Sequence, residues 1–85
     1  MDSISPKQLF ESILKGRAEY ARERNQADKL AGLLDCIEIL NGREPTYLNK
    51  KQCMQVLEAT VEQLKKGIPF STYEELTKAL RSLKL

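Results

Sequence analysis

Apolar side chains recur along most of the chain at intervals of three and four residues, which is the spacing of one face of an α-helix. No segment of useful length alternates between apolar and polar residues with a period of two. The sequence therefore predicts an all-α fold. Three apolar stripes stand out: Leu30, Leu33, Leu34, Ile37 and Leu40; Met54, Leu57, Val61, Leu64 and Ile68; and Tyr73, Leu76, Leu80 and Leu83.

Helix start and stop signals divide the chain. Ser5-Pro6-Lys7-Gln8 combines a serine cap, a proline at the first helical position and a glutamine at the third, and Asn49-Lys50-Lys51-Gln52 repeats the cap and the glutamine. We interpret Ser71-Thr72-Tyr73-Glu74 as a third capping box. Asn41-Gly42 and Gly67 are stop signals. The predicted helices cover residues 6–24, 26–41, 48–66 and 72–83.

Residues 6–41 allow two interpretations. The apolar face around Leu9 and Ile13 and the stripe from Leu30 to Leu40 lie roughly 150° apart on a continuous helix of 3.6 residues per turn. A break near Arg24-Asn25 removes this conflict, and Asn25 could then cap the second helix, so we favour two helices. The alternative is one long helix whose two faces serve different partners.

The 85-residue length predicts a single domain, residues 1–85, built as a small bundle of three to four antiparallel helices. Hydrophobic residues make up 41% of the chain and charged residues 31%, which is typical of a folded protein rather than a disordered one. A chain this short buries only about 60% of its unfolded surface, so homodimer formation would add useful burial.

Charge and hydropathy bear on nucleic-acid binding, membrane insertion and cellular location. Fourteen Lys and Arg against twelve Asp and Glu leave a net charge of +2, a weaker basic excess than dedicated nucleic-acid-binding domains carry. No apolar run approaches the roughly 20 residues that span a bilayer, and the sequence does not start with a secretory leader pattern. We expect a cytoplasmic protein without a membrane span.

The residue types that carry most enzyme chemistry are missing. The sequence has no histidine, its four glycines never cluster, and its two cysteines fall short of the four ligands of structural zinc. We therefore expect no catalytic residue, no cofactor and no metal. Cys36 and Cys53 would lie at similar heights in a helical hairpin, which leaves a disulfide open, although we favour reduced packing residues.

Two segments suggest DNA or RNA binding as an alternative function. The stretch 15–29 is rich in Lys and Arg, but Glu19 and Glu23 lie within it and dilute its potential. Residues 49–83 loosely resemble a helix-turn-helix motif, in which the start of the second helix reads the bases. Glu74 and Glu75 would oppose DNA there.

A few residues break the amphipathic rule and suggest a docking surface. Arg17 and Arg24 fall near the middle of the first apolar stripe, beside Tyr20, and Tyr and Arg are enriched in protein-binding hot spots. Ile39 and Val56 lie off the stripes of their helices, and we expect them to be ordinary exposed apolar residues. We predict a non-enzymatic interaction module, such as an adaptor, inhibitor, immunity or antitoxin-like protein or regulator, that binds another protein through Arg17, Tyr20 and Arg24.

Overall fold

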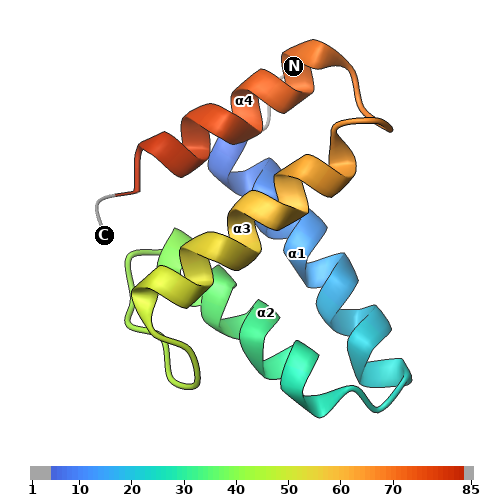
Figure 1. The fold of residues 1–85 in the computed structure, drawn as a ribbon, viewed down its shortest axis with the longest axis vertical. Helices are drawn as coiled ribbons and strands as arrows, with labels where there is room; N and C mark the ends of the chain where they lie inside the picture. Colours follow the sequence, from blue (N-terminus) through green and yellow to red (C-terminus); the bar gives the residue numbers. More distant parts are fainter. Residues whose placement is uncertain (1–4, 84–85) are drawn as a thin grey trace.

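The computed structural model describes residues 5–83, which form four α-helices and no strand (Figure 1). The helices are α1 (Pro6–Glu23), α2 (Ala27–Leu40), α3 (Lys50–Leu64) and α4 (Phe70–Arg81). The prediction of a small all-α bundle is confirmed. Within this part of the chain, no helix combines the length and the apolar character that crossing a bilayer would require.

Two of the three predicted capping boxes are present. The Ser5 hydroxyl accepts a bond from the Gln8 backbone N–H at 3.1 Å, and the Asn49 side-chain oxygen Oδ1 accepts one from the Gln52 backbone N–H at 2.7 Å. The glutamine side chains accept in return from the capping N–H groups, which satisfies two otherwise orphaned donors at each helix start. These contacts fix where α1 and α3 begin.

The start of α4 differs from the prediction. The helix begins at Phe70 rather than at residue 72, and Pro69 is the N-cap residue, with φ −61° and ψ 152°. Proline favours this extended entry to a helix because its ring fixes φ. Ser71 consequently lies inside the first turn, and the interpretation of Ser71–Glu74 as a capping box is wrong.

A turn at Arg24–Gln26 separates α1 from α2, so the two-helix interpretation of residues 6–41 is confirmed. Asn25 has φ 58°, in the left-handed region, and its N–H donates to the Arg22 carbonyl at 3.1 Å. The Gln26 N–H donates to the Ala21 carbonyl at 2.9 Å, which completes a Schellman motif. Asn25 therefore ends α1, and the prediction that it caps α2 is wrong.

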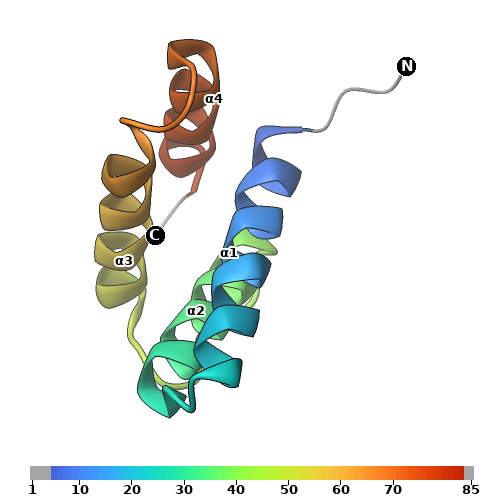
Figure 2. The same cartoon turned by 90° about the vertical axis from the view of Figure 1, so that its right-hand side faces the viewer.

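The helices form two hairpins, α1–α2 and α3–α4, which face each other (Figure 2). The pairs in direct contact are α1 with α2, α2 with α3, α3 with α4, and α4 with α1. Because α2 packs against both α1 and α3, it is buried on two sides, and Ile39 is only 4% exposed. The prediction that Ile39 is exposed is wrong, whereas Leu34, which we had placed in the apolar stripe, is 42% exposed.

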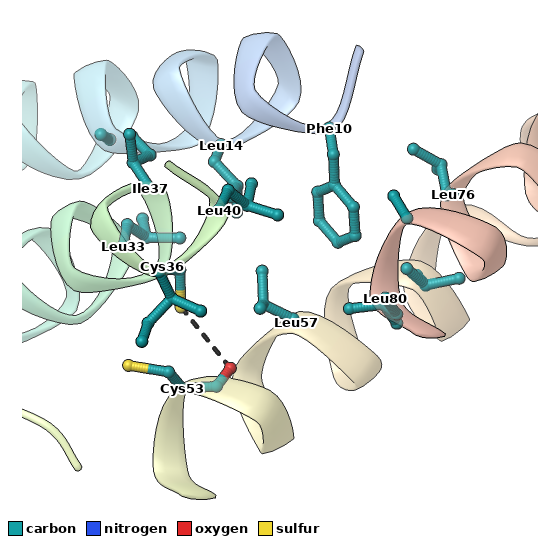
Figure 3. Packing of buried hydrophobic residues seen from close by; sticks show 14 of the residues in the cluster. Phe10, Leu14, Leu33, Cys36, Ile37, Leu40, Cys53, Leu57, Leu76 and Leu80 are labelled. Carbon is teal, nitrogen blue, oxygen red and sulfur yellow. Dashed lines mark hydrogen bonds between the residues drawn. The ribbon is translucent and has the colours of Figure 1, made fainter. Parts of the chain in front are cut away.

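The core is aliphatic except for one aromatic ring. Phe10 points from α1 into the space between Leu40 of α2 and Leu76 and Leu80 of α4, and Leu57 of α3 lies beside it (Figure 3). All four helices therefore meet around the side chains of Phe10 and Leu57, both of which are fully buried.

A buried carboxylate holds the connection between α2 and α3. The Asp35 side chain accepts backbone N–H bonds from Thr46 at 2.9 Å, Tyr47 at 2.6 Å and Leu48 at 2.7 Å. Burial alone raises the pKa of Asp35, but these three donors outweigh that effect and leave the pKa below its usual value. The loop residues held in this way delay the start of α3 from the predicted residue 48 to Lys50.

The two cysteines are free and buried on facing helices (Figure 3). The Cys36 thiol donates to the backbone carbonyl oxygen of Cys53 at 3.7 Å. Burial raises the pKa of Cys36 to about 12 and also raises the pKa of Cys53. They are packing residues in their thiol form, as we favoured from the sequence.

Replacing Asp35 by Asn should lower the free energy of unfolding at pH 7 by about 2 kcal/mol, because the three N–H donors lose a charged acceptor. The folded-state pKa of Asp35 is depressed, so its stabilisation is complete above the unfolded-state pKa and disappears as the pH falls through the folded-state value. Urea unfolding followed by circular dichroism at pH 7 and at more acidic pH tests both statements. The exposed Glu58→Gln change is the matched control, and an Asp35→Asn deficit independent of pH would contradict the assignment.

The native thiols should resist thiol–disulfide exchange with an added reagent. At pH 8, Ellman's reagent should react with Cys36 and Cys53 more than about 100-fold more slowly in the native protein than in guanidinium chloride, because burial disfavours the thiolate and blocks access. Absorbance of the released thiol chromophore measures the rate. Rapid labelling of either cysteine in the native protein would show that α2 and α3 separate easily.

Candidate protein-binding groove

The structure brings the three predicted site residues, Arg17, Tyr20 and Arg24, together at one end of α1. Arg17 is half-buried, and its Nη1 atom donates to Oε1 of Gln63 on α3 at 2.9 Å. This bond joins α1 and α3, whose backbones do not approach each other closely. Arg17 therefore marks the edge of the core and also links the two hairpins.

Arg24 and Tyr20 form a second contact beside Arg17. The Arg24 guanidinium lies 4.5 Å from the centre of the Tyr20 ring, a cation–π geometry, and Tyr20 is 56% exposed. Such a contact is worth about 0.5–1 kcal/mol at an exposed site. It favours one arrangement of the two side chains before any partner binds.

Two adjoining hollows lie among the C-terminal half of α1, the N-terminal half of α2 and the middle of α3, with volumes of about 450 and 480 Å³. In Figures 1 and 2, these halves of α1 and α2 extend beyond α3. Both hollows share Arg17, Lys29 and Leu33, and we refer to them together as the Arg17 groove. The first is lined by Arg17, Asp28, Lys29, Gly32, Leu33, Leu48, Val56, Ala59, Thr60 and Gln63. The second is lined by Ile13, Gly16, Arg17, Tyr20, Lys29 and Leu33.

The charged side chains of the Arg17 groove are mostly cationic. Among residues 5–83, the five salt bridges join other pairs, and none of them involves Arg17, Arg24 or Lys29. Asp28 is the one carboxylate in the lining of the two hollows. Of the three charged side chains in the lining, Arg17 and Lys29 are therefore cations without a salt bridge in the described chain, and Asp28 adds one negative charge above the apolar floor.

The basic stretch 15–29 does not form one continuous surface. The turn at Asn25 divides it between α1 and α2, so the helical register that would place its cations on one face is interrupted. Lys15 pairs with Glu11 at 3.8 Å, and Arg22 pairs with Glu19 at 2.8 Å. These pairs reduce the charge available to phosphates.

Several residues of the groove were missed from the sequence. Lys29, Gln63 and Leu48 lie on three separate segments, and only the crossing of the helices brings them together. Val56 gave a signal, because it lies off the apolar stripe of its helix, and it turns out to be half-buried in the first hollow. Gly16 is another residue that the sequence could have indicated, because it lies in the middle of α1 and glycine weakens a helix interior.

No contact within the described residues requires a glycine at position 16. A Cβ atom built there would meet nothing within 4 Å, so Gly16→Ala should raise the free energy of unfolding by about 0.5–1 kcal/mol through helix propensity. Gly42 is the matched control because it also faces open space, but its φ of +74° should make Gly42→Ala destabilising by about 1 kcal/mol. Urea unfolding measures both. A destabilising Gly16→Ala change would indicate that α1 needs a glycine for its own packing.

Within residues 5–83, no group of three or more His, Cys, Asp and Glu side chains is arranged to hold a metal ion. The chain matches no protein-family model, no curated protein and no solved structure.

Proposed function

We propose that this chain is a non-enzymatic protein-interaction module that binds another protein through the Arg17 groove. The observation that carries the proposal is the combination, on one surface, of an apolar floor, the Arg24–Tyr20 stack and cations without carboxylate partners. Arginine and tyrosine supply much of the binding energy in protein interfaces, because each combines apolar contact area with hydrogen bonding.

The side chains of the groove are also held in place in advance. The hydrogen bond from Arg17 to Gln63 and the contact of Arg24 with the Tyr20 ring each favour one arrangement, so less side-chain entropy is lost when a partner orders them. A cytoplasmic location belongs to the proposal and is supported by the free Cys36 and Cys53, because reducing compartments preserve thiols.

A photo-crosslinker tests the position of the surface. Benzoylphenylalanine replacing Tyr20 should crosslink a specific protein in cells of the source organism. The same residue replacing Phe70, which is 69% exposed at the start of α4, should not capture that protein. The same partner captured from both positions, or none captured from position 20, would contradict the proposal.

Charge reversal at the groove should weaken capture of that partner. Arg17→Glu and Arg24→Glu should each reduce its affinity by about tenfold or more, because each replaces an attractive contact by a repulsive one. Arg81→Glu, an exposed change of the same type on α4, should leave affinity unchanged. Isothermal titration with the purified partner measures the three values, and circular dichroism verifies folding.

Two other outcomes would redirect the proposal. Light scattering that shows a dimer, disrupted by Arg17→Glu, would make a second copy of the chain the occupant of the surface. A mobility shift with DNA or RNA that weakens steeply with salt would instead support the alternative of a nucleic-acid-binding regulator.

A further inference from the structure

The lining of the Arg17 groove constrains the chemistry of whatever binds there. Arg17 has several N–H donors, and its only hydrogen-bond acceptor among the side chains of residues 5–83 is the neutral amide of Gln63. Lys29 borders both hollows and has no salt bridge in the same part of the chain. An anionic group bound in either hollow would therefore face two cations, Arg17 and Lys29, and in the first hollow it would also have to avoid the Asp28 carboxylate.

The apolar floor of the groove favours a partner that has aliphatic side chains on either side of its anionic group. Leu33 borders both hollows, Val56 and Leu48 line the first, and Ile13 lines the second. Apolar groups that fill the hollows would release water from these surfaces, with the Arg17 side chain between them. Because Arg17 and Lys29 line both hollows, an acidic group paired with them would lie next to aliphatic groups that fill either hollow.

Gly16 indicates the backbone form of the occupant. It lies in the second hollow, it is the position of α1 where no side chain covers the backbone, and no neighbouring atom in the described chain explains its presence. A missing Cβ lets another backbone approach closely. An α-helix of a partner could approach α1 closely at Gly16 and also reach the first hollow. Binding of an amphipathic helix in a groove is a common mode of protein recognition.

We propose that the Arg17 groove binds an acidic amphipathic α-helix of another protein, with an Asp or Glu at Arg17 and Lys29 and with aliphatic residues in the two hollows. This inference rests on the proposed function and specifies the partner's chemistry. It predicts that the bound helix crosses α1 at Gly16.

A displayed library of random peptides of about 15 residues, long enough to form a helix, tests the inference. The library is selected on the immobilised full chain and counter-selected on its Gly16→Leu variant, which fills the second hollow. The selected peptides should carry Asp or Glu flanked by Leu, Ile or Phe at helical spacing. They should gain helical circular dichroism on binding.

Affinities of one selected peptide for variants of the chain complete the test. Arg17→Glu and Gly16→Leu should each weaken its binding by about tenfold or more, and Arg81→Glu should not. A peptide in which the acidic residue is replaced by Arg should recover affinity for the Arg17→Glu chain. That recovery requires direct contact, which a general loss of stability would not produce.

The outcomes separate this inference from the function on which it rests. Selected peptides without acidic residues, peptides that bind the Gly16→Leu variant equally well, or a library with no enrichment would overturn the acidic helix. If the natural partner still depended on Arg17 and Arg24, the interaction function would stand without it. If binding of the natural partner did not depend on Arg17 and Arg24 either, both the acidic-helix inference and the proposed interaction function would be contradicted.

Discussion

The placement of α3 depends on the Asp35 carboxylate. Three consecutive backbone N–H groups of the α2–α3 connection point at this one buried acceptor, so the loop can follow only one path before the cap at Asn49 starts the next helix. A buried charge is tolerated when it is fully hydrogen-bonded. The start of α3 that this carboxylate helps to set lies about two turns before Leu57, which packs in the core, and about four turns before Gln63, which accepts from Arg17.

The central position of α2 explains why the core and the groove coexist in a small chain. This helix contacts α1 on one side and α3 on the other, and its C-terminal half supplies most of its buried residues, including Cys36, Ile37 and Leu40. Its N-terminal half diverges from α3 and leaves Lys29 and Leu33 bordering the hollows. The same element therefore closes the core at one end and opens the groove at the other.

Local signals in the sequence predicted most of the fold. The caps at Ser5 and Asn49 act within four residues, and the break at Asn25 was detectable because the apolar faces on its two sides disagree. The role of Asn25 was misjudged because asparagine suits both ends of a helix: it accepts hydrogen bonds at a start and tolerates left-handed φ at a stop. The start of α4 was predicted two residues too late because both Pro69 and Ser71 are residue types that suit the beginning of a helix.

The groove was only partly predictable. Arg17, Tyr20 and Arg24 were predictable because they lie within about two helical turns and interrupt one apolar stripe, but Lys29, Leu48 and Gln63 join them through helix crossings that no local pattern encodes. Asp35 escaped notice for a similar reason, since its acceptors serve a loop 11 to 13 residues away.

The closed ring of helix contacts also bears on how the chain folds. Three of its four interfaces join elements that follow one another in sequence, and only the contact between α4 and α1 must bring distant segments together. Folds dominated by such local contacts have low contact order and form rapidly. The docking of α4 over Phe10 therefore closes the longest loop among the four helix interfaces and carries the largest loop-closure entropy.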